Sequence, residues 1–538
     1  MSSHRIDARP PAGPSTAPAL VTDPEHLRPL LEDAAHFSGG WASGLTLAAT
    51  ERDVADALGS GQPILPVGAQ SSLTGGATPM GETLLSTARL NRVLAVGSDS
   101  VRVQAGVSLS ALDEALGAEG RYYPPAPTFD GAFVGGTVAT NAAGAATFKY
   151  GTTRDWVKGL TVVLPGGDVL DIVRGAVSAD PDRGFEVRLA GGVAHVPAPR
   201  YVMPDVPKIS AGYFSRPGMD LIDLFIGSEG TLGVITEVTL RVLPARPVVA
   251  LAFATFRDRA AAMRVVHRLR DDSRETWRSR NPRGLDVSAI EHLDARSLAL
   301  LREDGIDRKH GVRVPADAAM ALLVTLELPA GTTAERAFDD IGRARDADAP
   351  DTPLVRFCRI LDQAGVLDTT EIAAPDDRAR AYQLLAVREA VPEAVNARVG
   401  RAKRDIDARI EKTAADMIVP FDVVDDLLTA YDEVFGRHRL DVAVWGHISD
   451  GNVHPNVIPR SFADVEAGKT AILELGRRVI QMGGSPLAEH GVGRNPVKQQ
   501  LLQEMYGAGG IEDMRRIKRA FDPQWRLAPG VLFPSRSG

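Results

Sequence analysis

The stretch PVGAQSSLTGGATP, residues 66–79, follows a short apolar run, PILPV, that has the size of a β-strand. It contains three glycines, two serines and two threonines. Because glycine allows positive φ and close approach of the backbone, such a loop can turn its N–H groups and hydroxyls toward a phosphate. The stretch has neither the Gly-Lys-Ser/Thr of a Walker loop nor the G-x-G-x-x-G of a doubly wound fold. A phosphate-binding loop and a long surface turn both remain open on this spacing alone.

Two more glycine-rich loops follow in the same part of the chain. Residues 122–151 are low in charge and rich in Gly and Ala, so their backbone can pack against something flat and extended. Residues 223–236 read as a strand, a glycine turn and a second strand. Strand-sized runs alternate with short helical stretches around these loops, which indicates an α+β domain. Three such loops in one domain favour a large ligand that carries phosphate.

Composition excludes several classes of protein. The 538 residues are 44% hydrophobic and 24% charged, which is typical of a globular chain of two or three domains. A net charge of -8 without a long basic block argues against a nucleic-acid partner. Cys358 is the single cysteine, so internal disulfides, cysteine zinc sites and iron–sulfur clusters are excluded. No apolar run has the length of a transmembrane helix.

A second informative stretch, VWGHISDGNVHPNVIP, spans residues 444–459 and contains two histidines. If Asp450 and Gly451 form a two-residue turn, for which Asp-Gly is a favoured pair, His447 faces His454 across a hairpin. Directly opposed side chains have Cβ atoms about 4.5 to 5.5 Å apart, which lets two imidazoles share one metal ion. A cross-strand histidine pair without a ligand is the alternative.

Two histidines leave a divalent ion short of ligands, so a carboxylate is expected elsewhere. The stretch GGSPLAEHGVGRN, residues 483–495, offers Glu489 and His490 before a glycine-rich turn. A His-His-Glu set with open positions suits Zn²⁺ or Mn²⁺ acting as a Lewis acid on a substrate oxygen. A neutral histidine beside it can take a proton.

The glycine-rich half resembles a known flavoprotein superfamily. PVGAQSSLTGG, VGGTVATNAAG, YGTTRDWVKGL and GSEGTLGVIT look like the FAD-binding loops of the vanillyl-alcohol oxidase and p-cresol methylhydroxylase superfamily. The resemblance covers about residues 46–244. It implies an α+β fold with a two-subdomain FAD-binding domain of the p-cresol methylhydroxylase type and a C-terminal α+β substrate (cap) domain. In that superfamily the first loop holds the diphosphate, the second runs along the isoalloxazine and the third lies by the adenine end.

The resemblance assigns cofactor contacts residue by residue, and these lie in the three loops: Pro66, Val67, Gly68, Ala69, Gln70, Ser71, Ser72 and Thr74; Pro127, Gly135, Gly136, Thr137, Thr140, Asn141 and Gly144; and Glu229, Gly233, Val234 and Ile235. Some members attach the flavin through a histidine in the first loop, and none stands in residues 67–76, so noncovalent FAD is expected. Ala126 stands where relatives often have Asp, and Ala528 where they usually have Asn. Each departure removes one polar flavin contact.

GHISDGNVHPN and AEHGVG resemble the C-terminal signature of the FAD-linked 2-hydroxyacid dehydrogenases. That group includes D-lactate dehydrogenase, D-2-hydroxyglutarate dehydrogenase and the flavin subunit of glycolate oxidase. Its pattern assigns His447, His454 and Glu489 to a divalent metal, with Zn favoured over Mn or Fe. It assigns Asn456 to a neighbouring polar contact and His490 to the general base.

The resemblance implies FAD-dependent oxidation of a D-2-hydroxy acid to the 2-oxo acid, with hydride transfer to flavin N5 and assistance from the metal. A dehydrogenase is favoured over an oxidase, and the electron acceptor would be a quinone, a cytochrome or an electron-transfer flavoprotein. A flavin-dependent transferase of the alkyl-dihydroxyacetonephosphate synthase type is the alternative. The substrate carboxylate needs a cation, and Arg388 in LLAVREAVPEAV and Lys412 in RIEKTAADMIVP resemble the substrate-binding positions. For both, a solvated surface charge is the alternative.

These inferences predict a domain organisation. Residues 1–40 are expected to form a flexible tail, which is favoured over a transit peptide. Residues 41–247 are expected to form the FAD-binding domain, and residues 248–514 the substrate domain with the metal site. Residues 515–538 return to the FAD domain. The chain is expected in the cytoplasm or peripherally at a membrane, with a homodimer as one candidate oligomeric state.

Overall fold

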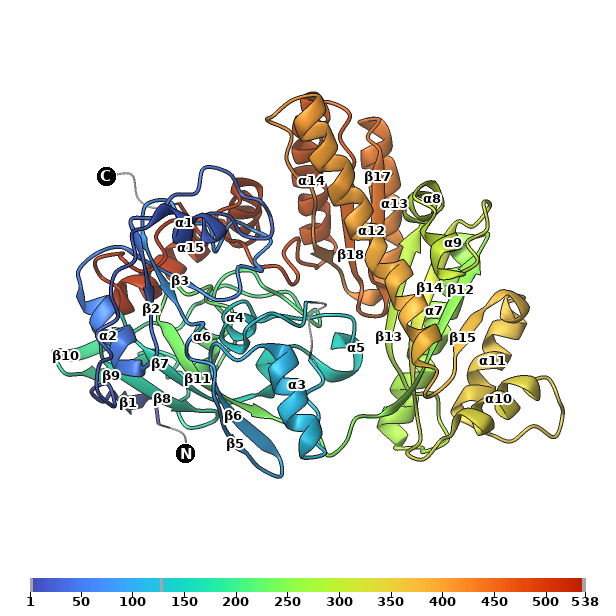
Figure 1. Cartoon of the computed structure of the whole chain (residues 1–538), viewed down its shortest axis with the longest axis horizontal. Coiled ribbons are helices and arrows are strands. Elements are labelled where there is room, and N and C mark those ends of the chain that lie inside the picture. The colour runs from blue at the N-terminus through green and yellow to red at the C-terminus, as the bar shows by residue number, and fades with distance from the viewer. Residues whose placement is uncertain (1–2, 126–128, 535–538) are drawn as a thin grey trace. The chain divides into compact units, whose positions relative to one another are not determined.

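The computed structural model describes residues 3–125 and 129–534, and its contacts divide the chain into two compact units (Figure 1). Unit 1 comprises residues 1–144, 151–246 and 487–538, and unit 2 comprises residues 145–150 and 247–486. Both units mix helices with sheets, so the chain has the α+β architecture that the sequence predicts.

Unit 1 contains three sheets. A parallel sheet has the strand order β2 (Gly44–Leu47), β4 (Thr83–Ser86), β3 (Ile64–Val67). An antiparallel sheet has the order β5 (Val93–Val96), β6 (Ser100–Gln104), β11 (Val234–Arg241), β7 (Val157–Val163), β8 (Val169–Val173). A small sheet has the order β1 (Arg5–Asp7), β9 (Phe185–Leu189), β10 (Gly192–Val196). The helices of this unit are α1 (Pro24–Leu27), α2 (Glu51–Gly59), α3 (Leu109–Ala118), α4 (Val134–Ala139), α6 (Ile222–Phe225) and α15 (Pro496–Phe521).

Helix α2 shows how local sequence and packing agree in unit 1. Thr50 caps its N-terminus, because its hydroxyl accepts from the Asp53 N–H while the Asp53 carboxylate accepts from the Thr50 N–H. The face that carries Val54 and Leu58 packs into a core with strand residues such as Val163. This packing joins the parallel sheet to the antiparallel sheet and fixes the loops at the ends of their strands.

The N-terminal segment differs from the flexible tail predicted for residues 1–40. Strand β1 pairs in parallel with β9, and the Arg9 guanidinium binds both Glu51 and Asp171. Thr16 Oγ1 donates to Asp53 Oδ2 at 2.8 Å. The Pro- and Ala-rich composition predicts a tail, but these distant carboxylates hold the segment to unit 1, and no local pattern reveals them.

The domain boundary near the C-terminus also differs from the prediction. Unit 2 ends at Pro486 rather than at residue 514, so Glu489 and His490 belong to unit 1. The reason is helix α15, which spans the predicted boundary and buries Met514, Ile517 and Phe521 in unit 1.

Unit 2 is built on one antiparallel seven-stranded sheet with the order β15 (Glu371–Ala373), β12 (Val248–Phe256), β14 (Met320–Leu328), β13 (Val287–Asp294), β17 (Val442–His447), β18 (Asn452–Val457), β16 (Met417–Ile418). Its helices are α5 (Thr147–Tyr150), α7 (Arg259–Ser279), α8 (Ala295–Glu303), α9 (Ile306–His310), α10 (Ala334–Gly342), α11 (Pro353–Gln363), α12 (Arg378–Asp405), α13 (Val424–Arg437) and α14 (Phe462–Gln481). The spacing of apolar residues in DDRARAYQLLAVREAVPEAVNAR, residues 376–398, predicts a helix, and MALLVTLELPA, residues 320–330, reads as a strand closed by a turn. Helix α12 and strand β14 confirm these two predictions.

Helix α12 covers one face of the unit 2 sheet (Figure 1). Leu384, Val387, Val391 and Val395 recur at helical spacing and are fully buried against strand residues. Arg388 follows Val387 and is itself 91% buried, so this helix carries a cation into the interior of unit 2.

The part of the second glycine-rich loop that forms α5 belongs to unit 2. Lys149 Nζ donates to Asp286 at 2.8 Å and to Glu327 at 2.5 Å, and Tyr150 Oη donates to Glu327 at 2.8 Å. These ionic and hydrogen-bonded contacts anchor α5 beside β13 and β14.

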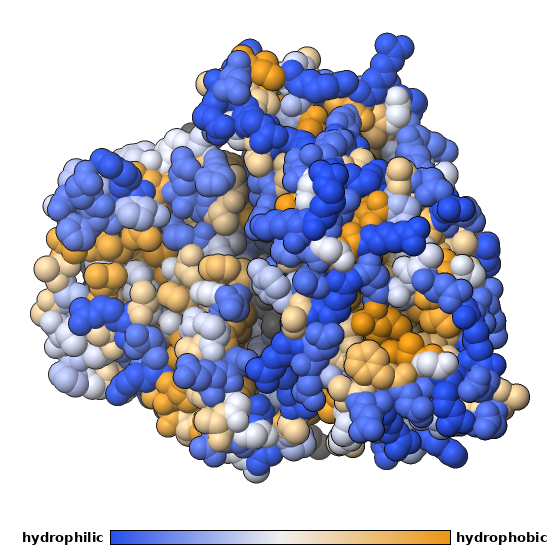
Figure 2. All heavy atoms as spheres, turned by 45° about the vertical axis from the view of Figure 1, so that its right-hand side comes forward, coloured by the Kyte–Doolittle hydropathy of each residue, from blue (hydrophilic) through white to orange (hydrophobic). Residues whose placement is uncertain are grey.

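Among the described helices, none is both long enough and apolar enough to cross a bilayer. The exposed large apolar side chains include Trp41 and Val202 in unit 1 and Phe338 and Tyr382 in unit 2. Figure 2 shows small apolar patches between larger hydrophilic areas.

Candidate functional site

The first glycine-rich loop connects β3 to β4 in unit 1, and Pro66 and Val67 end the strand before it. Among the residues that the structure describes, none accepts a hydrogen bond from the backbone N–H groups of Gly68 to Leu73, a run that includes Ala69 and Ser71. Gln70 has a φ of 55°, and its Nε2 donates to the carbonyls of Leu30 and Ala77. The Gln70 side chain therefore shapes the loop, while the row of N–H groups offers donors for phosphate oxygens.

The hydroxyls of this loop meet a carboxylate from the N-terminal segment. Ser72 Oγ and Thr74 Oγ1 lie 3.3 Å apart. Burial raises the pKa of Asp33, and hydrogen bonds from Ser72 and from the backbone of Ala35, Gly75 and Ala77 oppose that rise. Asp33 was missed from the sequence because it stands in the predicted tail.

The second loop forms α4, where adjacent glycines have different surroundings. A Cβ on Gly135 would lie 2.6 Å from the Cβ of Ala105, so this glycine lets α4 pack against β6. A Cβ on Gly136 would meet nothing within 4 Å. The hydroxyls of Thr137 and Thr140 donate to backbone carbonyls of their own helix. The open side of α4 at Gly136 can therefore accept a flat group such as an isoalloxazine.

The end of the second loop is held by backbone and side-chain contacts within unit 1. Asn141 has a φ of 49°, and its Oδ1 accepts from the Arg154 N–H at 3.0 Å. Gly144 is the last residue of this part of unit 1, directly before the segment that forms α5. The predicted contact Pro127, like the departure at Ala126, lies outside the described residues.

In the third loop, Glu229 has a role that the sequence did not predict. Its φ is 52°, and its two carboxylate oxygens accept from the backbone N–H groups of Val492 and Gly493, each at 2.8 Å. Burial raises the pKa of this carboxyl to about 7, although the two N–H donors oppose the rise. Glu229 therefore holds the turn that follows Glu489 and His490, and its flavin contact stays a prediction.

The other predicted residues of the third loop serve packing. A Cβ on Gly233 would lie 2.5 Å from Val162 Cγ1, and Val234 and Ile235 begin β11 beside β7. Ala528, near the C-terminus, has a φ of 44°, a region in which Asn is more common than Ala. The departure at Ala528 therefore bears on the backbone conformation at this position.

The histidine stretch forms a hairpin, but its register differs from the predicted one. His447 pairs with Asn452 and Trp445 pairs with His454, and residues 448–451 form a four-residue loop with a short 3-10 turn. The predicted two-residue turn at Asp450-Gly451 is therefore wrong. Because the register shift is two residues, it keeps His447 and His454 on the same face. Their ring centroids lie 5.4 Å apart, with the rings nearly perpendicular.

Asp416 joins this histidine pair, although the sequence analysis missed it. Its Oδ1 lies 3.3 Å from His454 Nδ1 and accepts from Asn452 Nδ2 at 3.0 Å. Asp416 is 1% exposed and His454 6% exposed. Asp416 directly precedes β16, which pairs with β18, so only the long-range strand pairing brings it to the hairpin.

A third histidine of unit 2, His292 on β13, was also missed. Burial is the main cause that lowers the pKa of its imidazole to about 3; a backbone hydrogen bond with Gly446 opposes this shift, and His454 and His447 add to it. This ring is therefore neutral at every pH at which the fold is expected to operate.

Arg388 lies in an ion-paired chain that leads to the hairpin. Its Nε donates to the carboxylate of Glu291 on β13, and Glu291 Oε2 lies 3.6 Å from His447 Nδ1. Among the described residues, none accepts a hydrogen bond from the two Nη groups of Arg388. The guanidinium is therefore oriented by Glu291 while its fork remains available for a carboxylate.

The two other predicted substrate contacts lie at the end of the hairpin. Asn456 is 3% exposed, and its Nδ2 donates to the His454 carbonyl at 3.1 Å. Ala414 forms an isolated bridge with Asn456 of β18. Lys412 is half-buried and stands two residues before Ala414 in the chain.

Glu489 and His490 form a second group of candidate ligands, which lies in unit 1. Lys208 Nζ donates to Glu489 Oε2 at 2.9 Å, and Glu489 Oε1 lies 3.7 Å from His490 Nε2. The His490 side chain is 30% exposed, while that of Glu489 is 7% exposed. Both this group and the Asp416–His454 group carry atoms that bind metal ions.

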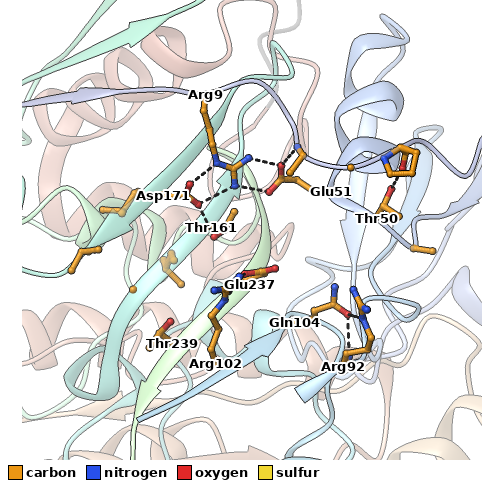
Figure 3. Close-up of a pocket in the computed structure, with 18 residues that line it drawn as sticks. Arg9, Thr50, Glu51, Arg92, Arg102, Gln104, Thr161, Asp171, Glu237 and Thr239 are labelled. Carbon is orange, nitrogen blue, oxygen red and sulfur yellow. Dashed lines mark hydrogen bonds and ion pairs between the residues drawn. The ribbon is translucent and has the colours of Figure 1, made fainter. Parts of the chain in front are cut away.

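A cavity of about 590 Å³ lies elsewhere in unit 1, on the outer face of the antiparallel sheet (Figure 3). Arg9 points between Glu51 and Asp171 at its edge, and Arg102 lies beside Glu237. None of the residues predicted for cofactor, metal or substrate lines this cavity. The ion pairs of Arg9 with Glu51 and Asp171 hold the N-terminal segment to the sheet at this cavity.

Comparisons with known proteins match both halves of the chain. The family model described as FAD linked oxidases, C-terminal domain, matches residues 245–532, and the FAD binding domain model matches residues 42–172. A D-2-hydroxyglutarate dehydrogenase of Xanthomonas citri pv. viticola is 31% identical over 87% of this chain and 84% of its own length. A D-lactate dehydrogenase of Anaerostipes hadrus is 28% identical with the same two coverages. The glycolate oxidase subunit GlcD of Bacillus subtilis is 27% identical over 88% of this chain and 84% of its own length.

Solved structures share the fold at low identity. A p-cresol methylhydroxylase with substrate bound is 15% identical, with a TM-score of 0.65, and the match covers 96% of this chain and 94% of that one. An alkyldihydroxyacetonephosphate synthase is 16% identical, with a TM-score of 0.59 over 97% of this chain and 89% of that one. These two likenesses concern architecture alone.

Proposed function

Because the chain belongs to the FAD-linked oxidases, we propose that it oxidises a D-2-hydroxy acid to the corresponding 2-oxo acid. Family membership makes it an FAD-linked oxidoreductase, and the relatives named for D-lactate, D-2-hydroxyglutarate and glycolate support the substrate class. The observation that carries the proposal is the buried group of His447, His454 and Asp416. Hydride transfer from carbon to flavin does not by itself require metal ligands, so this group supports a reaction that also uses a metal ion.

Unit 1 has the features that FAD needs. The N–H row from Gly68 to Leu73 would hold the diphosphate, and the open side of α4 at Gly136 would lie along the flavin ring. No histidine stands in the first loop, so the cofactor would be noncovalent. When bound, FAD supplies the acceptor for the hydride from C2 of the substrate.

His447, His454 and Glu489 are the proposed metal ligands, and the structure adds Asp416 as a candidate. Imidazole nitrogens and carboxylate oxygens form the donor set that suits Zn²⁺, with Mn²⁺ or Fe²⁺ as alternatives. An ion held there supplies a Lewis acid for the substrate hydroxyl.

The remaining residues would bind the substrate and move its proton. The free Nη fork of Arg388 would take the substrate carboxylate, with Glu291 fixing the orientation of the guanidinium. Lys412 would add a second cation, and Asn456 a polar contact. His490, which is partly exposed, would accept the hydroxyl proton as general base.

Anaerobic mixing with a panel of D- and L-2-hydroxy acids tests the proposal. We expect at least one D acid to bleach the flavin absorbance while its L enantiomer leaves it unchanged. A transferase of the alkyl-dihydroxyacetonephosphate synthase kind would show no net reduction of the flavin. Failure of D-lactate, D-2-hydroxyglutarate, glycolate and longer D acids to bleach the flavin would therefore contradict the proposed reaction.

A further inference from the structure

We propose that Lys208 is a positioning residue that fixes the carboxylate of Glu489 for metal binding, an inference that rests on the proposed function. Lys208 lies in the segment between β10 and α6, and its side chain is fully buried. Its Nζ donates to Glu489 Oε2 at 2.9 Å. The Glu489 side chain is 7% exposed, so this ion pair is shielded from water.

The segment that carries Lys208 connects two parts of the candidate site within unit 1. Ser210 N donates to the Leu487 carbonyl at 3.1 Å, two residues before Glu489. Ser210 Oγ donates to the Thr140 carbonyl at 2.9 Å, at the end of the second glycine-rich loop. Residues 208–210 therefore tie the proposed flavin loop to the segment that carries Glu489.

Stability alone is a poor explanation for this lysine. A buried ion pair loses so much hydration that well-packed apolar residues in its place are often equally stable or more so. A ligating carboxylate, in contrast, is commonly held by a further hydrogen bond that sets its orientation. Lys208 supplies that bond and leaves Glu489 Oε1 on the side of His490.

A second tether acts on the same segment from the other end. Glu229 accepts from the N–H groups of Val492 and Gly493, so the turn after His490 is fixed as well. A Cβ on Gly491 would lie 3.0 Å from the Glu229 carboxyl group, which shows how closely the turn and the carboxylate pack. With Lys208 at one end and Glu229 at the other, Glu489 is oriented before any ion binds.

The test is the metal affinity of the full-length flavoenzyme, measured by competition with a chromophoric chelator for Zn²⁺ and Mn²⁺. Lys208→Met removes the charge at similar length, and we expect the metal Kd to rise by about 10- to 100-fold. Lys208→Arg keeps a cation and is expected to recover at least part of that loss. The matched control is Lys518→Met, because Lys518 is an equally buried lysine of unit 1 that binds Asp522 and the Thr231 and Leu527 carbonyls.

The control variant should lose stability but keep the metal Kd within about threefold of wild type. The proposal would be overturned if Lys208→Met kept the wild-type metal Kd. It would also be overturned if Lys208→Met and Lys518→Met lost metal affinity equally. If Lys208→Met is recovered unfolded, refolding with excess Zn²⁺ or Mn²⁺ supports the proposal and no rescue opposes it. Failure of the proposed function would show separately, because the wild-type enzyme itself would then bind no metal.

Discussion

The glycine loops of unit 1 and the histidine hairpin of unit 2 build their parts of the candidate site in opposite ways. The loops offer backbone N–H groups and open space, as at Gly68 and Gly136, while the hairpin offers the buried side chains His447, His454 and Asp416. A backbone site is damaged by adding atoms, whereas a side-chain site is damaged by removing them. The two regions should therefore respond differently to small substitutions.

Removal of one hairpin imidazole is the strongest test of the side-chain region. His454→Ala should lower kcat by about 10³-fold, because a Lewis acid contributes several kcal/mol to the transition state. FAD content per chain should stay at the wild-type level, since His454 lies in unit 2. His267→Ala, at an exposed histidine of α7, is the control. Steady-state turnover measures kcat, and flavin absorbance measures the FAD content of the same samples. Full turnover in His454→Ala would contradict the proposed role of the buried side chains of the hairpin.

His490→Ala examines the other candidate ligand group. We expect kcat to fall by about 10²-fold, which is the usual contribution of a general base. His195→Ala, at an exposed histidine on β10, should behave as wild type. Full wild-type kcat in His490→Ala would show that this residue is not the general base.

The adjacent glycines of α4 separate packing from cofactor binding. Gly135→Ala places a methyl against Ala105 and should lower the free energy of unfolding by about 1–3 kcal/mol. Gly136→Ala meets no protein atom, so the apoprotein should be as stable as wild type or slightly more stable. Its FAD Kd should nevertheless rise by about tenfold, because the methyl occupies the proposed place of the ring. Thermal melts and flavin titration distinguish the two variants. Wild-type FAD affinity in Gly136→Ala would show that the flavin ring does not lie on this face of α4.

The smallest expected effect is a pH dependence of stability from Glu229. Its pKa is raised from 4.5 to about 7 in the folded protein, so the folded state binds this proton more tightly than the unfolded state. Stability from this group is therefore present below pH 4.5 and is lost as the pH rises through 7. Because the residue is half-buried, we expect a loss on the order of 1 kcal/mol. Denaturant unfolding between these pH values should show a flatter dependence in Glu229→Gln, and identical slopes would refute this assignment.

Sequence patterns were sufficient where the signal is local. The three loops and the helix over residues 376–398 follow from glycine content and helical spacing, and the structure confirms them as elements. The register of the histidine hairpin was not predictable in this way. Its loop is buried, a Cβ on Gly451 would lie 2.4 Å from the Val419 carbonyl, and Ser449 Oγ accepts from the Ile290 N–H. Packing against β13 and the segment after β16 therefore overrides the Asp-Gly turn signal.

The missed residues share a physical reason. Asp416, Glu291 and Lys208 reach candidate ligands or their neighbours through strand pairing or long-range ion pairs, and none of them stands in a motif. The N-terminal segment was misread for the same reason, since Arg9 finds Glu51 and Asp171 far along the chain.

The central claim is that the flavin of unit 1 and a metal on the histidine and glutamate ligands serve one reaction. Single-turnover reduction of the flavin by a D-2-hydroxy acid, before and after complete removal of metal, tests this most directly. We expect removal to slow flavin reduction by at least about 10²-fold, and Zn²⁺ or Mn²⁺ to restore the original rate. Reduction of the metal-free enzyme at the wild-type rate would contradict the account.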